Sequence, residues 1–170
     1  MAKVAAGVGA LGAFIAARTA TIAIAGLGTA LGIMGSPVLA FHKMGKSLGT
    51  REGLKAAGKA GLEAFKTDLP NWIKKTTTFA AATGQGLNAI SGSLCQYAGM
   101  KTIAAGVEKF GPKCEKVLAT AGTAAGLTAG AAAMTNKVFW IASLTAGAFA
   151  CLAGVLRSDL ITPKPLENPE

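Results

Sequence analysis

The stretch VLATAGTAAGLTAGAAAMTNKVFWIASLTAGAFACLAGVL, residues 117–156, decides the fold class. It contains no carboxylate, and Lys137 is its only charged residue. Gly122, Gly126 and Gly130 recur at every fourth position, so on a helix they form one stripe without side chains. The pattern predicts two apolar helices that fold back near Lys137, with a glycine groove that allows close helix contact.

The second half of this stretch has the length and composition of a membrane-spanning helix. A span needs roughly 20 apolar residues, and residues 138–156 carry no charge. The first half is rich in Ala, Gly and Thr, so it would insert poorly alone but could follow a neighbour that it contacts closely. Two interpretations remain open: a bilayer-inserted pair, or a hairpin buried inside a helical protein assembly.

The composition favours an all-α protein. Hydrophobic residues make up 51% of the 170 residues and charged residues 15%, against about a quarter in typical soluble domains. Ala is abundant, 23 residues are Gly, and no sustained polar/apolar alternation predicts strands. We therefore expect Gly/Ala-rich helical hairpins, membrane-inserted or tightly packed in an assembly, with a basic amphipathic helix between them.

Charge is distributed unevenly along the chain. The formal net charge is +9, and the acids occur in three short windows separated by the apolar segments. Long stretches without carboxylates are expected where a chain meets hydrocarbon or an anionic surface. The resulting organisation has five segments: 1–42 an N-terminal apolar helix or hairpin, 43–75 a basic amphipathic segment, 76–116 a Gly-rich helical connector, 117–157 the apolar hairpin, and 158–170 a polar, Pro-containing tail.

Three features shape the N-terminal segment. Arg18 divides its apolar residues, so the segment forms either a tight hairpin or one long helix with Arg18 on a protected face. Because an arginine at the middle of a bilayer is costly, we expect Arg18 to lie near an interface or to snorkel toward one. Gly28 and Gly32 form a GxxxG pair that favours helix packing. Pro37 is expected to kink or end the helix.

The basic middle predicts an amphipathic helix over residues 51–66, with Thr50 as its N-cap and residues 68–70 as its end. A tryptophan followed by two lysines then has the composition of an interfacial anchor. The residues predicted to contact an anionic surface are Lys55, Lys59, Lys66, Trp72, Lys74 and Lys75. An ordinary solvated helix is the competing interpretation.

The connector predicts one or two helices interrupted at residues 84–86, where Gly, Gln and Gly follow one another. Residues 108–116 form a charged break, in which Gly111-Pro112 predicts a turn and the start of the next helix. After Arg157 the Pro-containing tail is expected to be extended or flexible.

Few residues could carry chemistry. His42 is the only histidine, and the three cysteines are widely spaced without a CxxC motif. Gly7, Gly9 and Gly12 match the letters of a dinucleotide loop but lack the surrounding strand–helix–strand pattern. We therefore expect no catalytic, metal or cofactor site.

The function expected from these features is that of a non-enzymatic, membrane-inserting helical protein that self-associates through glycine-lined contacts. It would act as a channel, a translocation or injection component, or a membrane scaffold. The expected partners are an anionic lipid bilayer and further copies of the chain, with no small-molecule substrate. One alternative is a structural subunit of a filament or virion with its hairpins buried between copies, and a third is a basic nucleic-acid-associated protein.

Overall fold

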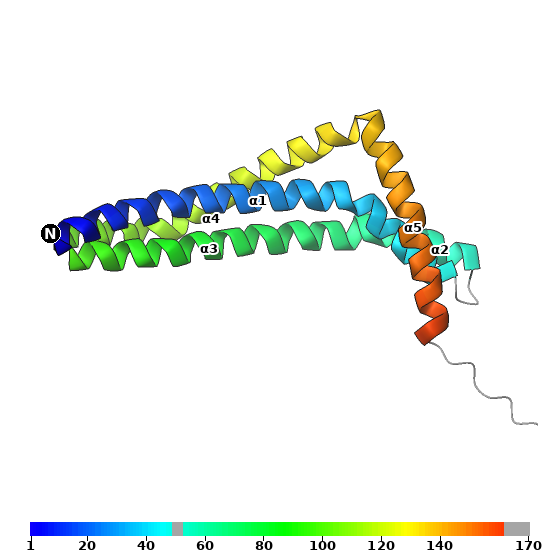
Figure 1. Cartoon of the computed structure of the whole chain (residues 1–170), viewed down its shortest axis with the longest axis horizontal. Coiled ribbons are helices and arrows are strands. Elements are labelled where there is room, and N and C mark those ends of the chain that lie inside the picture. Colours follow the sequence, from blue (N-terminus) through cyan, green and yellow to red (C-terminus); the bar gives the residue numbers. More distant parts are fainter. Residues whose placement is uncertain (49–52, 162–170) are drawn as a thin grey trace, which may run out of the picture. The chain divides into compact units, whose positions relative to one another are not determined.

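The computed structural model describes residues 1–48 and 53–161, with side chains described as far as Arg157. Every regular element within these residues is helical and no strand is present, so the all-α prediction is confirmed. The elements in order are α1 (Ala2–Leu48), α2 (Gly53–Glu63), the π-helical segment η1 (Ala64–Asp68), α3 (Leu69–Tyr97), α4 (Lys101–Met134) and α5 (Lys137–Ile161) (Figure 1).

The chain forms two compact units, which are treated separately below. Unit 1 consists of Met1–Gly32 and Trp72–Ala131, and unit 2 of Ile33–Asn71 and Ala132–Glu170. The three long helices α1, α3 and α4 contribute residues to both units.

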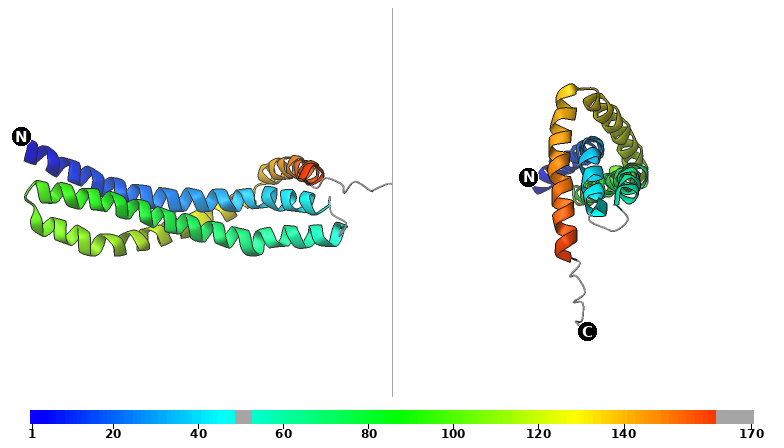
Figure 2. Two further views of the ribbon diagram at one scale, coloured as in Figure 1. Left: turned by 90° about the horizontal axis from the view of Figure 1, so that it is seen from below. Right: turned by 90° about the vertical axis from the view of Figure 1, so that its right-hand side faces the viewer.

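Unit 1 is a three-helix bundle of α1, α3 and α4, which lie side by side (Figures 1 and 2). The backbone of Gly28 lies against Thr76, and Ser91 Oγ donates to the carbonyl of Ala10 at 2.8 Å. Because residue numbers in these contacts rise on α1 as they fall on α3, these two helices are antiparallel. Its buried clusters are built from small residues such as Ala25 and Ala80, which keeps the helices close together.

The long-helix alternative for the N-terminal segment is the one that the structure shows. α1 continues through Pro37 to Leu48, so Pro37 does not end the helix. Proline lacks the N–H that would bond the carbonyl four residues earlier, here that of Ile33. Ser36 Oγ donates to this carbonyl at 2.7 Å and replaces the missing donor.

The predicted charged break at 108–116 was wrong. α4 begins at Lys101 and continues through Pro112. Gly111 is a contact position instead of a turn, because a Cβ there would lie 3.2 Å from Asn88 Nδ2 on α3. Packing against α3 therefore decides the conformation that local sequence signals suggested to be a turn.

The predicted interruption at residues 84–86 was also wrong, because α3 is continuous from Leu69 to Tyr97. The chain reverses after α3 instead, at residues 98–100, where Gly99 has a φ of +84°. This left-handed conformation is one that glycine adopts without steric cost.

In unit 2, α2 and η1 lie against the last turns of α1. Gly61 faces the side chain of Met44, and Lys43 Nζ lies 2.5 Å from Asp68 Oδ2. The predicted helix end at residues 68–70 was wrong, because η1 leads directly into α3. Pro70 falls in the first turn of α3, directly after the π-helical segment, where the Leu69 N–H bonds the Ala64 carbonyl. The predicted N-cap and the first residues of the amphipathic helix, 50–52, lie outside the described residues.

The remaining helix of unit 2, α5, crosses the C-terminal part of α1 at a steep angle (Figure 2). Gly147 lies against the ring of Phe41, and Gly154 against the backbone of His42 and Lys46. α5 extends to Ile161, so residues 158–161, which were predicted to belong to the tail, are helical. The rest of the predicted tail, 162–170, lies outside the described residues.

Candidate functional site

The most unusual position in unit 1 is Glu115 of α4, whose side chain is 0% exposed. It is the only Asp, Glu, Lys or Arg that is buried among the described side chains. It shares one face of α4 with residues that are small or apolar. The buried residues of this face are Ala104, Val107, Gly111, Glu115, Ala119, Gly122, Gly126 and Gly130.

Donors from both other helices of unit 1 surround the Glu115 carboxylate. Asn88 Nδ2 of α3 donates to Oε1 at 2.8 Å, and Arg18 Nη1 of α1 lies 3.2 Å from the same oxygen. Thr21 Oγ1 of α1 lies 2.5 Å from Oε2. An ionised carboxylate only accepts hydrogen bonds, and all three partners can donate. The network therefore satisfies the buried charge.

Arg18 is held by further contacts. Its guanidinium lies 3.4 Å from the ring centroid of Phe14, and Nη1 also donates to the Phe14 carbonyl at 3.3 Å and to Asn88 Oδ1. Its side chain is 21% exposed. A cation over an aromatic face gains electrostatic attraction when it is partly desolvated. The protected face expected for Arg18 is thus formed by an acid, an amide and an aromatic ring.

Gly84 of α3 provides the space for this network. A Cβ at Gly84 would overlap Thr21 Oγ1 and the Glu115 carboxylate. Thr21 Oγ1 also lies 2.8 Å from the Ala17 carbonyl and 3.4 Å from the Ala80 carbonyl. A hydroxyl has one proton to donate, and Glu115 Oε2 is its nearest acceptor. All three helices of unit 1 therefore meet at one polar point.

The network can hold the three helices of unit 1 in one fixed arrangement. A buried ion pair adds little net stability, but removing one partner leaves an uncompensated charge and costs about 3–5 kcal/mol. A hydrogen-bonded group of this kind has one correct alignment, because a shift of any helix separates the partners. No group of three potential His, Cys, Asp or Glu metal ligands occurs within residues 1–48 and 53–161.

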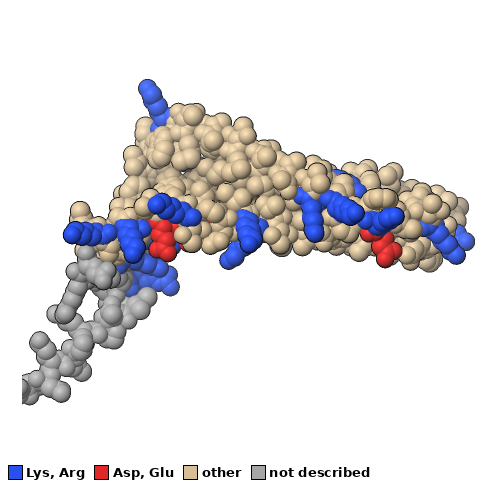
Figure 3. Space-filling view, turned by 180° about the vertical axis from the view of Figure 1, so that it is seen from behind, with Lys and Arg blue, Asp and Glu red and all other residues tan. Residues whose placement is uncertain are grey.

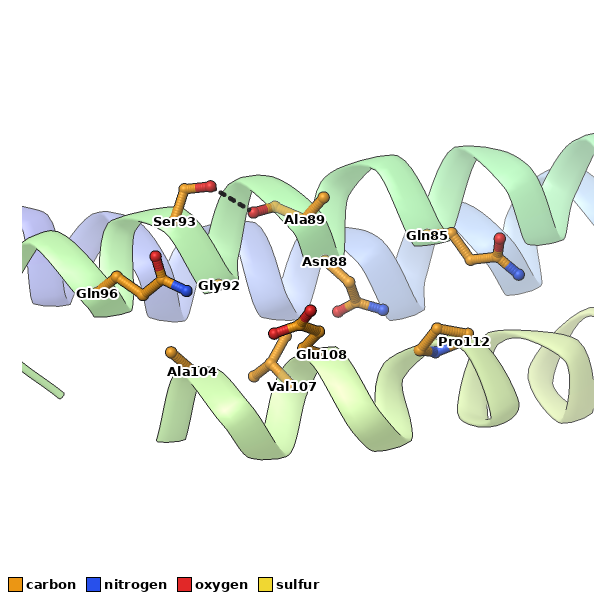
Figure 4. Close-up of a pocket in the computed structure, with 10 residues that line it drawn as sticks. All are labelled: Gln85, Asn88, Ala89, Gly92, Ser93, Gln96, Ala104, Val107, Glu108 and Pro112. Carbon is orange, nitrogen blue, oxygen red and sulfur yellow. Dashed lines mark hydrogen bonds between the residues drawn. The ribbon is translucent and has the colours of Figure 1, made fainter. Parts of the chain in front are cut away.

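Beside the network, α3 and α4 border a groove of about 310 Å³ (Figure 4). Asn88 contributes to its wall, so this residue links the buried network to the surface. The lining residues are Gln85, Asn88, Ala89, Gly92, Ser93, Gln96, Ala104, Val107, Glu108 and Pro112. The amide and hydroxyl groups among them make this side of the bundle suited to water contact.

The five glycines predicted for helix packing all lie in unit 1. Gly122 and Gly126 lie against α1, where a Cβ at Gly122 would be 2.8 Å from the Ile22 carbonyl. Gly28 faces Thr76, Gly32 faces the Trp72 ring, and Gly130 is buried. The described neighbours of Gly122 and Gly126 are on α1.

The residues predicted to contact an anionic surface are exposed, but they fall in both units. Lys55, Lys59 and Lys66 lie in unit 2, on α2 and η1. The other three, Trp72, Lys74 and Lys75, lie in unit 1 on α3. Trp72 is tied to its own unit, because its Nε1 donates to the Gly28 carbonyl at 2.9 Å.

Sequence reasoning did not identify the Glu115 network. A usable signal was present, because Glu115 precedes Gly122 by seven residues and therefore shares the face of the glycine stripe. Asn88 carried no comparable signal, since polar residues are frequent in the segment around it.

Comparison with protein-family models, with curated proteins and with solved structures finds no match to this chain.

Proposed function

We propose that this chain is a non-enzymatic protein that inserts into a lipid bilayer through α5 and α1 and associates with further copies of itself. The observation that carries the proposal is the surface of α5. Only 17% of the most apolar stretch of α5 is buried inside the structure. Large exposed side chains such as Ile141, Phe149 and Leu152 cover it, with no charge between Lys137 and Arg157. Surfaces of this kind are typical of contact with lipid or protein.

α1 supports the proposal with a second apolar surface. Its exposed side chains Val4, Val8, Leu11 and Ile15 recur at three- and four-residue spacing, which places them along one helix face. Arg18, the next charged residue along α1, is paired with Glu115 inside unit 1. By length and composition, α1, α4 and α5 are the described helices that could cross a membrane.

Unit 1 also has a polar side, and this side does not enter lipid in the proposed arrangement. Lys109, Lys113 and Lys116 are exposed on the first half of α4. All three are within six residues of Glu115 on the same helix. A lysine at the centre of a bilayer is costly, so in the proposed arrangement this side stays in contact with water.

Self-association in this proposal uses exposed apolar faces, because the packing glycines already contact other helices of the same chain. A channel, a translocation or injection component, and a membrane scaffold all remain compatible with such a surface. Ion conductance of reconstituted protein distinguishes the first role from the other two. A filament or virion subunit is the second candidate, since contact with other copies would cover the same faces.

Membrane sedimentation after carbonate washing tests the proposal. The chain is expected to remain in the pellet, whereas Leu144→Arg should be released, because an arginine at the centre of a span costs about 2.5–3.5 kcal/mol. Thr135→Arg, at the exposed turn before α5, is the control and should remain. Detergent-free purification of the chain as a soluble, uniform polymer would refute insertion and favour the filament candidate.

A further inference from the structure

The α2–η1 segment exposes its large apolar residues and buries its small ones. Ala57, Gly61 and Ala64 face the rest of unit 2 and are buried. Leu54 is 84% exposed, and Leu62 and Phe65 are also exposed. A helix that only packed against its own protein would turn its large apolar side chains inward, because their burial stabilises most. The arrangement therefore leaves an apolar strip uncovered.

Three lysines run beside this strip. Lys55, Lys59 and Lys66 are exposed, and Lys66 directly follows the exposed Phe65 in η1. Within α2, at about 100° per residue, Lys55 and Lys59 are next to Leu62 and on the side away from the buried small residues. Apolar and basic surfaces are thus presented on the same outer side.

The acids of the segment do little to neutralise these lysines. Asp68 is occupied by Lys43, whose Nζ lies 2.5 Å from Oδ2. Glu63 is exposed, and no ion pair joins it to a lysine among the described residues. The surface drawn in Figure 3 likewise shows basic side chains more often than acidic ones.

We propose that α2 and η1 lie in the plane of a bilayer surface that contains anionic lipid. Leu54, Leu62 and Phe65 enter the boundary between headgroups and acyl chains, while the lysines contact lipid phosphates and carboxylates. Amphipathic helices with basic edges bind membranes in this way. A nucleic acid would accommodate the lysines but would leave Leu54 and Leu62 without an apolar environment, so lipid fits the whole surface. The inference rests on the proposed function, in that both place the chain at a bilayer.

Vesicle binding tests the basic edge. The full-length chain is diluted from detergent into vesicles of phosphatidylcholine, with or without phosphatidylserine, and bound protein is measured by sedimentation. Neutralising Lys55, Lys59 and Lys66 to Gln is expected to weaken binding to the anionic vesicles roughly 10–100-fold, and to leave binding to neutral vesicles unchanged. The control replaces Lys109, Lys113 and Lys116 with Gln, which removes the same charge from unit 1.

A second pair of variants tests the apolar strip. Leu54→Gln with Leu62→Gln should weaken binding to both kinds of vesicle, because apolar burial does not depend on lipid charge. Ile90→Gln with Ile103→Gln, at exposed apolar positions of unit 1, is the control and should bind as the unchanged chain does. Circular dichroism confirms that each variant keeps its helices.

Three outcomes would overturn the inference. Equal losses from the two lysine sets would show that net charge alone drives binding. No effect of the Leu54 and Leu62 replacements would exclude the in-plane helix. Stronger binding of this surface to duplex DNA than to anionic vesicles would assign it to nucleic acid. Retained anionic binding without carbonate resistance would refute insertion by α5 while supporting the α2 surface, so the two proposals can fail separately.

Discussion

The two units join their helices by different means. Unit 1 places a charged, hydrogen-bonded group, Glu115 with Arg18, Asn88 and Thr21, in the middle of its bundle. In unit 2, α5 crosses α1 through Gly147 and Gly154, beside a hydrogen bond between the His42 ring and the Ala150 carbonyl at 3.0 Å. A polar group fixes one alignment because its partners must meet, whereas a glycine contact depends on how closely two backbones approach.

The two units also differ in the side chains that they bury and expose. Unit 1 hides its one buried acid and keeps basic side chains on part of its surface. Unit 2 contains α5, whose buried residues are Ser143, Gly147 and Gly154, and whose large side chains face outward. Substitutions that act on only one of these two kinds of contact can therefore show whether the distinction is real.

The largest effect is expected from Glu115→Ala. This substitution leaves Arg18 without its paired carboxylate and Asn88 Nδ2 without its acceptor, and should lower the free energy of unfolding of unit 1 by about 3–5 kcal/mol. Hydrogen exchange of unit 1 amides measures the change. Glu108→Ala, at an exposed position of the same helix, is the control and should change stability by less than about 0.5 kcal/mol. Similar results for the two variants would show that the network does not hold unit 1 together.

Gly126→Leu tests the glycine stripe against α1. A side chain here would meet the Gly26 carbonyl and Thr29 Cβ, so we expect destabilisation of unit 1 by about 3 kcal/mol. Ala125→Leu, at the neighbouring exposed position, should have little effect. Chemical denaturation followed by circular dichroism compares the two, and equal midpoints would exclude a contact specific to the stripe.

Gly154→Ala tests the corresponding contact in unit 2. The added methyl would press on the His42 carbonyl and the Lys46 amide, at a cost of roughly 1–3 kcal/mol. Alanine recovers about 0.5–1 kcal/mol through its better helix propensity, so a net loss of about 1 kcal/mol is expected. Amide exchange in α5 should accelerate while that of α3 stays unchanged. Acceleration in both helices would mean that the two units do not respond separately.

The smallest change is expected from Thr29→Val, and it has the opposite sign. Thr29 is 0% exposed, and its Oγ1 has no hydrogen-bond partner among the described residues. Valine has nearly the same shape without the buried hydroxyl, so unit 1 should become more stable by about 1 kcal/mol. A loss of stability on denaturation would show that the hydroxyl does have a partner.

The helical class could be predicted from the chain because Ala, Gly and apolar runs leave no alternative pattern over most of its length. Helix ends were harder to predict. Pro37, Pro112 and the Gly84–Gly86 region all carry local signals for a break, yet each lies inside a helix. At Pro37 the compensation is local, because Ser36 bonds the Ile33 carbonyl. Gly84 and Gly111 instead face side chains of neighbouring helices, and these contacts depend on residues that only folding brings together.

The residues of the candidate site were equally hard to predict from the sequence. Arg18 could be recognised as needing a protected environment, because an unpaired arginine in an apolar segment is costly. Its partners are distant in sequence, with Asn88 on α3 and Glu115 on α4, and helical spacing alone does not say which helix faces which. The role of Glu115 was therefore hidden in a run of charged residues that local composition marked as solvent-exposed.

The two tryptophans lie in different units, and each is held there by a hydrogen bond. Trp72 Nε1 donates to the Gly28 carbonyl in unit 1, and Trp140 Nε1 donates to the Met134 carbonyl at 2.6 Å in unit 2. Since the chain has two tryptophans, each unit contains one tryptophan. Emission from a single-tryptophan version, made by Trp72→Phe or Trp140→Phe, follows the melting of one unit without any added label.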